Sequence, residues 1–403
     1  MRHLVHAPAS REASDVAVLS TTHASPLPSM RSPDRRATPR DRIAVVGYGY
    51  WGSKHVRVLS STPHVDVTIV DGQMSRLAEA AAHYPSARVA PTLEDVLHDV
   101  DAVVVATPPG THAAIARCAL EARKHVLVEK PLATSVEDAE MLVEIAADQG
   151  VHLMVGHTFE YNAAVWKLRE LVRTGALGRI LYIDAARLSL GRYQSDVNVI
   201  WDLAPHDISI ISYILDEMPS CATVWAHSHI NRQHADVAYL RLDFPQSQAR
   251  AYVHVSWLTP NKVRQVTVVG EKKMAVYDDM SDNERIRIYD IGVDVQEIDD
   301  PEEAHALPVS YRTGDIVSPY IPFHEPLLLQ DQHFVECLRT GTRPNTPGER
   351  GLEVVRVLAA TDQLADVAGE DVVAGADVST GESGVPTIPV PPPMADRRLF
   401  SAR

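Results

Sequence analysis

Three glycines in the pattern G-x-G-x-x-G constrain the fold of this chain more than any other feature. They directly follow the β-branched run Ile43–Val46 and precede a helical stretch. The first glycine permits a tight turn, the second lets the backbone approach a pyrophosphate, and the third allows the helix to pack closely on its strand. The helix amino terminus then offers free N–H groups and a positive dipole end to the phosphates. The motif predicts a dinucleotide site that includes Gly47, Gly49, Tyr50, Trp51 and Gly52.

An acidic residue at the end of the next strand indicates which dinucleotide binds. Asp71 lies 19 residues beyond Gly52, close to the spacing of about 20 expected for the acid that binds the adenosine ribose. Its carboxylate can accept hydrogen bonds from both ribose hydroxyls, would repel a 2′-phosphate, and has only Gly72 beside it. We therefore expect NAD rather than NADP, with Arg76 near enough to leave NADP open. If the glycines only formed a turn and Asp71 only capped one, the strand, the helix and the acid would not need to follow one another at these spacings.

From residue 42 onward, short β-branched runs alternate with alanine-rich helical stretches. This alternation predicts an α/β Rossmann fold, a doubly wound parallel sheet. The expected strands are Ile43–Val46, Val65–Val70, Ala102–Ala106, Val126–Val128 and His152–Val155. The helices expected between them include Met74–His83, His112–Glu121 and Ser135–Gln149.

The pattern changes near residue 155. A helix at Ala163–Arg173, a strand at Ile180–Ala186 and a helix near 202–215 are followed by several strands with few helices between them. We expect an α+β domain with an open, mostly antiparallel sheet arranged as a meander, with helices on one face and the other face available to a second subunit. The meander strands are Ala222–His229, Val237–Phe244, Ala249–Trp257, Arg264–Val269, Lys273–Tyr277 and Arg285–Tyr289, and the closing helices are Glu325–Leu338 and Glu349–Val367.

These patterns divide the chain into four segments. We expect a disordered leader over 1–40, an NAD-binding Rossmann domain over 41–155, a substrate-binding and oligomerisation domain over 156–369, and a disordered tail over 370–403. The leader and tail lack any hydrophobic period and are rich in small residues and proline. A transit peptide, or a start at Met30, is left open for the leader, and the closing helices are free to pack back on the Rossmann domain.

Composition excludes several classes of function. The net charge of −15 disfavours a general nucleic-acid binder, and no apolar run approaches the length of a membrane span. Three widely spaced cysteines indicate a reducing cytoplasm; they are Cys118, Cys221 and Cys337. A histidine group has no carboxylate–histidine signature around it, so no metal site is expected; it comprises His227, His229 and His234.

Two loops follow the expected strands Ala102–Ala106 and Val126–Val128, where a parallel sheet presents its carboxyl-end loops to a bound cofactor. The first is Thr107-Pro-Pro-Gly-Thr-His112, and the second is Glu129-Lys130-Pro131. A lysine at the end of the strand Val126–Val128 is expected to point into the crevice that holds the cofactor. We expect cofactor contacts from Thr107, Pro108, His112, Glu129 and Lys130.

An acid and a histidine four residues apart stand in the second half, at Asp202 and His206. On a helix, such positions share one face, so both side chains can project into one cleft. Oxidation of an alcohol needs a base for the hydroxyl proton, and histidine has a suitable pKa. Without further information, a helix-capping acid and a satisfied histidine are the favoured interpretation.

Together these residues resemble the glucose–fructose oxidoreductase/inositol dehydrogenase family, Gfo/Idh/MocA, over about residues 42–368. The motifs that carry the resemblance are the glycine motif, Thr107–His112, Glu129-Lys130-Pro131, Gly156-His157-Thr-Phe-Glu-Tyr161-Asn162, Trp201-Asp202-Leu-Ala-Pro-His206-Asp207 and His333-Phe334…Gly351-Leu352. The resemblance implies that Lys130, Asp202 and His206 are catalytic. It makes His206 the base, Asp202 its orienting or substrate-binding partner, and Lys130 the group that stabilises charge on the reacting oxygen. The residues do not decide whether Lys130 or His206 takes the proton first.

The resemblance further implies a homodimer or homotetramer and substrate contacts from Lys130, Tyr161, Asn162, Asp202 and His206. The chain departs from the common pattern at Glu160 and Ala163, where many members have Arg and Pro.

The motif around Asp202 and His206 also indicates a class of substrate. The Trp-Asp-Leu-x-Pro-His-Asp form resembles members that oxidise nucleotide-activated amino sugars at C3, such as UDP-N-acetylglucosamine or its uronic acid. Arg187 and Arg192 could neutralise a diphosphate there, or they are surface charges. An inositol (cyclitol) dehydrogenase, a keto-sugar reductase and a non-catalytic NAD-sensing binding protein are the alternatives.

Overall fold

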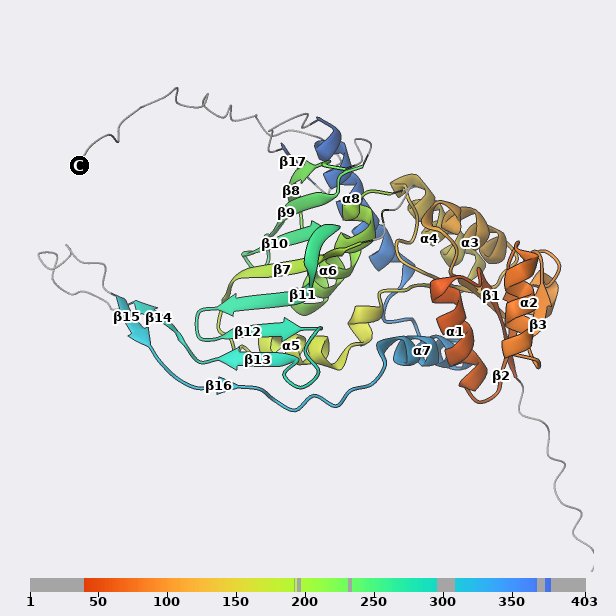
Figure 1. Cartoon of the computed structure of the whole chain (residues 1–403), viewed down its shortest axis with the longest axis horizontal. Coiled ribbons are helices and arrows are strands. Elements are labelled where there is room, and N and C mark those ends of the chain that lie inside the picture. The colour runs from red at the N-terminus through yellow and green to blue at the C-terminus, as the bar shows by residue number, and fades with distance from the viewer. Residues whose placement is uncertain are drawn as a thin grey trace, which may run out of the picture. The chain divides into compact units, whose positions relative to one another are not determined.

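The computed structural model describes residues 40–191, 193, 197–230, 234–295, 309–367 and 374–377, which build two main sheets (Figure 1). Residues 1–39 of the expected leader, most of the expected tail, and Arg192 lie outside the described residues. One short part of that tail is described. Ala374–Asp377 forms strand β17, paired antiparallel with β8 (Cys221–His227). The expectation of disorder was wrong for these four residues, because the edge of β8 offers unpaired backbone groups to an incoming strand.

The first sheet has six parallel strands in the order β3-β2-β1-β4-β5-β6, which confirms the predicted doubly wound fold. The strands are β1 (Asp41–Val46), β2 (Val65–Val70), β3 (Arg88–Ala90), β4 (Ala102–Val105), β5 (His125–Val128) and β6 (Leu153–Val155). Strand β3 was not predicted, because its three residues are too few to show a period.

Helices cover both faces of this sheet because the strand side chains alternate. Ile43 and Val45 of β1 pack in one core with α1 (Tyr50–Ser61), α2 (Met74–His83) and α7 (Pro326–Thr340). Ala44 and Val46 point the other way, into a second core with α3 (His112–Glu121) and α4 (Val136–Gln149). The closing helices therefore do pack back on the Rossmann sheet: α7 contacts α1, and α8 (Gly348–Val367) contacts α4.

The second sheet has nine strands in the order β16-β13-β12-β11-β7-β10-β9-β8-β17. Besides β8 and β17, its strands are β7 (Ile180–Leu190), β9 (Val237–Phe244), β10 (Ala249–Ser256), β11 (Leu258–Gly270), β12 (Met274–Asp278), β13 (Ile286–Tyr289) and β16 (Ile316–Val317). A separate two-stranded sheet joins β14 (Gly292–Val295) to β15 (Val309–Arg312).

The expected meander is wrong at one position. Strand β7 lies between β10 and β11, and it pairs parallel with β10 and antiparallel with β11. Periodicity along a strand reveals which face is buried and says nothing of its neighbours, so this insertion could not be predicted. The helices α5 (Ala163–Arg173), α6 (Val199–Leu215) and α8 lie on one face of the sheet (Figure 1). The opposite face exposes aromatic side chains, including Trp225, Tyr239 and Tyr252.

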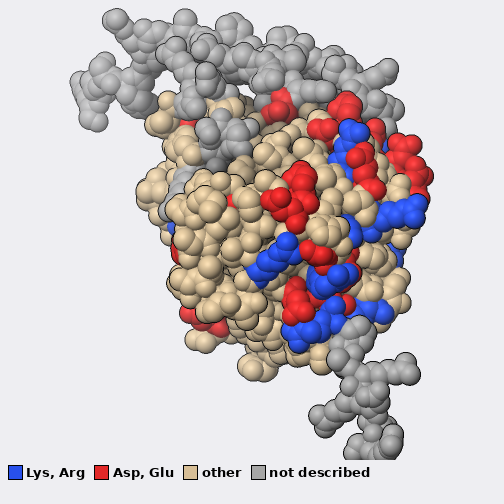
Figure 2. Space-filling view, turned by 90° about the vertical axis from the view of Figure 1, so that its right-hand side faces the viewer, with Lys and Arg blue, Asp and Glu red and all other residues tan. Residues whose placement is uncertain are grey.

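Several properties of the described part of the chain bear on function. Within it, no helix is long and apolar enough to cross a membrane, no disulfide forms, and no group of histidine, cysteine and acidic side chains is arranged to hold a metal. On the face shown in Figure 2, basic and acidic side chains lie interspersed rather than in one large patch of a single sign.

Candidate active site

A cleft of about 730 Å³ opens at the carboxyl ends of the parallel strands. The predicted cofactor residues that line it are Gly47, Gly49, Tyr50, Trp51, Asp71, Thr107 and Pro108. Helix α1 begins directly after Gly49, and no side chain caps its first N–H groups. A helix start of this kind is free to bind phosphate oxygens, so the cleft fits the dinucleotide that the glycine motif predicted.

The third glycine shapes this cleft without lining it. A Cβ atom on Gly52 would lie 1.7 Å from the carbonyl oxygen of Gly47, and its neighbour there is backbone that cannot move aside. Only glycine therefore allows α1 to start this close to the turn after β1.

Asp71 is buried beneath the rim of the cleft. Its Oδ2 accepts a hydrogen bond from the Tyr48 N–H at 2.7 Å, and its Oδ1 accepts one from the Gln73 N–H at 2.8 Å. The carboxylate thus holds the glycine turn in place and keeps lone pairs for a ribose. Arg76 Nη1 lies 3.4 Å from Asp71 Oδ2, and Arg76 also lines the cleft.

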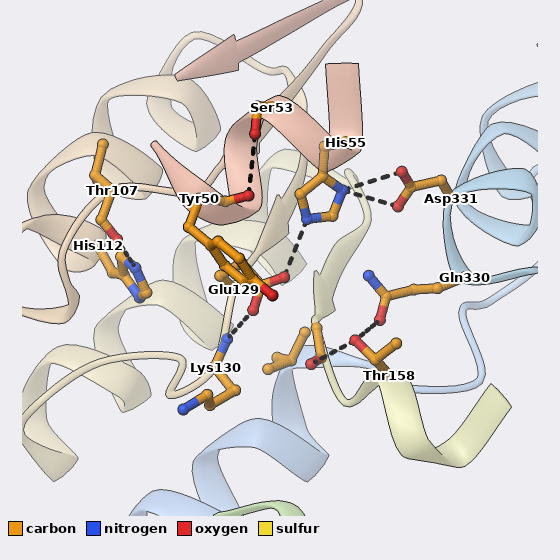
Figure 3. A network of polar contacts seen from close by, with 12 residues as sticks. Tyr50, Ser53, His55, Thr107, His112, Glu129, Lys130, Thr158, Gln330 and Asp331 are labelled. Carbon is orange, nitrogen blue, oxygen red and sulfur yellow. Dashed lines mark hydrogen bonds and ion pairs between the residues drawn. The ribbon is translucent and has the colours of Figure 1, made fainter. Parts of the chain in front are cut away.

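A buried cluster of charges stands behind the loop at the end of β5 (Figure 3). His55 of α1 is fully buried, with Nε2 3.0 Å from Glu129 Oε1 and Nδ1 3.0 Å from both carboxylate oxygens of Asp331 on α7. Burial alone would lower the pKa of His55, but the two carboxylates outweigh burial and raise the pKa to about 10. The imidazole is therefore a buried cation between two anions.

This cluster changes the role expected for Glu129. Glu129 Oε2 accepts a hydrogen bond from the Lys130 N–H at 3.1 Å, so both carboxylate oxygens are engaged inside the protein. Glu129 therefore positions the backbone of the lysine loop. Each of its oxygens keeps a lone pair, as in Asp71, so the expected cofactor contact of Glu129 stays a prediction. His55 and Asp331 were missed because residues 276 positions apart in sequence give no spacing signal.

Lys130 joins the two domains. Its Nζ donates to the Asp202 carbonyl oxygen at 2.7 Å and lies 3.3 Å from Asp202 Oδ1. Trp257 Nε1 donates to the other carboxylate oxygen of Asp202 at 3.1 Å. Asp202 is thus held between a lysine of the first domain and a tryptophan of the second, a tryptophan that sequence analysis did not single out.

His206 lies one turn after Asp202 on α6, as the spacing predicted. Burial, followed by the nearby charges of Lys130 and Arg187, lowers the pKa of His206 well below its ordinary value. The ring is therefore neutral at pH 7 and able to accept a proton. Its edge meets the Phe159 ring, with centroids 5.2 Å apart. Asp202 bonds to Lys130 and Trp257 instead of orienting His206, so that part of the expectation was wrong.

Lys130, Asp202 and His206 share a second cavity of about 570 Å³. A smaller space of about 140 Å³ is bordered by Thr107, His112, Lys130 and Asp202, and it has lining residues in common with both the cleft and the cavity. Trp51 lines the cleft, the cavity and the connecting space. The three candidate catalytic residues therefore lie beside the cofactor cleft.

His112 holds the two loops together next to this space. Its ring nitrogens lie 2.8 Å from the carbonyl oxygens of Thr107 and Pro131. Because both nitrogens are engaged within the protein, His112 serves as a brace between the loops.

Arg187 lines the second cavity, but its charge is already compensated. Its guanidinium makes two hydrogen bonds to the carboxylate of Asp207, at 2.8 and 2.9 Å, and the side chain is buried. The surface-charge alternative is therefore wrong for Arg187. The pairing with Asp207 weakens the diphosphate alternative, and only the buried Nη1 of Arg187 has no hydrogen-bond partner.

The side chains of Tyr161 and Asn162, which are neighbours in the sequence, lie in different surroundings. Tyr161 is buried in the core of the first sheet with its hydroxyl toward Thr346, and it lines none of the described cavities near Lys130, so its expected substrate contact is withdrawn. Asn162 does line the second cavity, with Oδ1 capping α5 and Nδ2 donating to the Tyr277 hydroxyl at 3.0 Å. Glu160, one of the departures from the family pattern, is buried and paired with Arg350 at 3.1 Å.

Known proteins match both halves of the chain. Residues 42–157 match the family model described as "Oxidoreductase family, NAD-binding Rossmann fold", and residues 165–276 match the "GFO/IDH/MocA C-terminal domain". A solved structure, GenD2 from gentamicin A biosynthesis in complex with NAD, aligns with a TM-score of 0.69 at 25% identity, over 84% of this chain and 97% of that one.

Three curated relatives carry different substrate names. UDP-N-acetylglucosamine 3-dehydrogenase of Acidithiobacillus ferrooxidans is 32% identical over 42% of this chain and 52% of its own length. Inositol 2-dehydrogenase of Rhodococcus erythropolis is 34% identical over 44% of this chain and 53% of its own. The chain thus spans about half the length of these two relatives. 4-carboxy-2-hydroxymuconate-6-semialdehyde dehydrogenase of a Sphingobium strain is 27% identical over 79% of this chain and 96% of its own.

The buried cation at His55 predicts a particular pH dependence of stability. The folded-state pKa of about 10 lies above the unfolded value of ~6.5, so the native state holds an extra proton between these pH values. The stabilisation from this proton is complete below the unfolded-state pKa and is lost as the pH rises through the folded-state pKa. Between the two, the free energy of unfolding should fall by up to about 1.4 kcal/mol per pH unit. Urea unfolding at several pH values should show this slope for the native chain and not for His55→Asn.

A matched control is His83→Asn, because His83 is exposed in the last turn of α2. Its slope should equal that of the native chain. If His55→Asn also kept the native slope, a protonated His55 would be ruled out.

Proposed function

The chain belongs to the Gfo/Idh/MocA oxidoreductase family, and from that membership we propose that it transfers hydride between a secondary alcohol of a sugar and NAD. The observation that carries this proposal is the placement of Lys130, Asp202 and His206 around one cavity beside the dinucleotide cleft. The substrate that we propose first is a UDP-N-acetyl-amino-sugar, oxidised at C3.

The proton steps follow from the site's electrostatics. Neutral His206 accepts the hydroxyl proton of the substrate as the carbon gives up its hydride. Lys130 donates a hydrogen bond to the same oxygen and offsets the negative charge that develops there. Asp202 holds the lysine ammonium in position. NAD, when bound, supplies the carbon that takes the hydride. His206 is favoured over Lys130 as the first proton acceptor, because the lysine already donates to Asp202.

The preference for NAD rests on Asp71. Its carboxylate lines the cleft at the end of β2 and would repel a 2′-phosphate, while Arg76 offsets part of that repulsion. The complex of GenD2 with NAD is in keeping with this choice.

The first-named substrate rests on the relative from Acidithiobacillus and on the Trp201–Asp207 motif. The inositol dehydrogenase is matched at similar identity, so a cyclitol is the second candidate. Reduction of a keto sugar uses the same residues in reverse. A non-catalytic NAD-sensing role is disfavoured because Lys130, Asp202 and His206 are all in place.

We also propose a cytoplasmic homo-oligomer. The aromatic side chains on the open face of the second sheet include Trp225, Tyr239 and Tyr252, all more than a third exposed, and such a surface suits a second subunit. The lack of disulfides among the described cysteines suits a reducing compartment.

Lys130→Ala and His206→Ala test the catalytic assignment. Each should lower turnover by at least ~10², the scale of acid–base groups, while NAD binding stays intact because neither side chain lines the cleft around the glycine turn. NADH formation measured with UDP-sugars, inositols and free hexoses checks the first point, and NAD titration checks the second. Exposed Lys262→Ala and His83→Ala serve as matched controls. Near-native turnover in both catalytic variants would refute the assignment.

Cofactor choice is tested by titrating the native chain and Arg76→Ala with each dinucleotide. NAD should bind more tightly than NADP to the native chain, and removal of the Arg76 charge should widen the difference by further weakening NADP. Tighter binding of NADP by the native chain would overturn the argument from Asp71.

A further inference from the structure

Two arginines line the cavity that holds Lys130 and His206 and share one carboxylate. Arg264 of β11 and Arg285, next to the start of β13, line this cavity together with Asp279. Arg264 Nη1 lies 3.5 Å from Asp279 Oδ2, and Arg285 Nη1 lies 3.6 Å from Asp279 Oδ1. Two positive charges therefore face a single negative one, which leaves this wall with an excess positive charge.

The two guanidinium groups also keep most of their hydrogen-bonding capacity. A guanidinium has five N–H donors, and the contacts to Asp279 are at the limit of hydrogen-bond length. Arg187 in the same cavity differs, because it bonds Asp207 twice at 2.8 and 2.9 Å. Arg187 thus has only its buried Nη1 without a hydrogen-bond partner, whereas Arg264 and Arg285 each keep most of their donors for a ligand.

The arginine wall is held in place from behind. Asp279 accepts a hydrogen bond from the Tyr277 hydroxyl at 2.8 Å, and that hydroxyl accepts one from Asn162 Nδ2 at 3.0 Å. On the other side, the Arg285 guanidinium lies 4.9 Å from the centre of the Phe323 ring. The side chain of Arg285 is only 17% exposed, so much of its water has already been displaced. A preorganised, partly dehydrated cation pair binds an anion at lower cost than mobile surface lysines do.

We propose that Arg264 and Arg285 bind an oxoanion carried by the substrate, a carboxylate or a phosphate, while Lys130 and His206 act on its hydroxyl. This inference rests on the proposed dehydrogenase function and narrows its substrate to an anionic polyol. A planar guanidinium matches the two oxygens of either group. An uncharged cyclitol would leave both arginines with only their long contacts to the shared Asp279. In a chain of net charge −15, a local positive wall also favours an anionic substrate at this one place.

The test measures binding, and needs no turnover. The protein saturated with NAD, so that the pyrophosphate site is filled, is titrated calorimetrically with inorganic pyrophosphate, D-glucuronate and uncharged myo-inositol. The native chain should bind at least one anion. The double variant Arg264→Met/Arg285→Met should weaken that anion at least 10-fold. If pyrophosphate loses more affinity than D-glucuronate, the natural group is a phosphate. If D-glucuronate loses more, it is a carboxylate.

Arg250→Met is the matched control, because Arg250 pairs with Asp243 on the sheet surface and lies outside the cavity. It should bind the anion as the native chain does. Arg264→Lys, which keeps the charge and loses the planar fork, covers the case in which the double variant fails to fold, and it should show an intermediate loss. Failure of the native chain to bind either anion, or unchanged binding in the arginine variants, overturns the inference.

These outcomes separate the inference from the proposed function. If the chain oxidises myo-inositol and binds no anion, the dehydrogenase proposal stands and the anion site falls. If anions bind through the arginines but no alcohol is oxidised, the site stands and the dehydrogenase proposal falls.

Discussion

A buried imidazolium between two carboxylates supports the inner wall of the active site. His55 comes from the first helix after the glycine turn, Glu129 from the end of β5, and Asp331 from a helix close to the end of the described chain. Removing one partner of such a buried group typically costs about 3–5 kcal/mol, because the remaining charge is left without compensation. The cluster therefore couples the position of the lysine loop to the docking of α7, and the buried charges are paired only when α7 is in place.

The chemistry proposed for the cavity depends on which of its ionisable groups have a partner of opposite charge and which do not. Asp202 is held between Lys130 and Trp257, and Arg187 makes two hydrogen bonds to Asp207. His206 has no such anionic partner beside it among the charges that shift it, so burial and the neighbouring cations keep it neutral. One set of residues thus provides a fixed cation and a neutral base within one cavity. Arg264 and Arg285 remain the incompletely paired charges at its wall.

Local sequence patterns predicted most elements well. Val65–Val70, Met74–His83, Ala163–Arg173 and Val237–Phe244 have the expected bounds, because each carries its own period and its own breakers. The failures involve pairing between distant segments. Strand β7 entered between β10 and β11, β17 joined the edge of β8, and Tyr161 turned into the core instead of the cavity.

The sequence alone determined the Rossmann turn, the acid at the end of β2, and the helix that carries Asp202 and His206 on one face. These are features of short segments, in which spacing converts directly into geometry. Only the tertiary structure decided the partners: Asp331 for His55, Lys130 and Trp257 for Asp202, Asp207 for Arg187, and a shared Asp279 for Arg264 and Arg285. The strength of a charge in a protein depends on burial and on neighbours distant in sequence. No spacing along the chain records either.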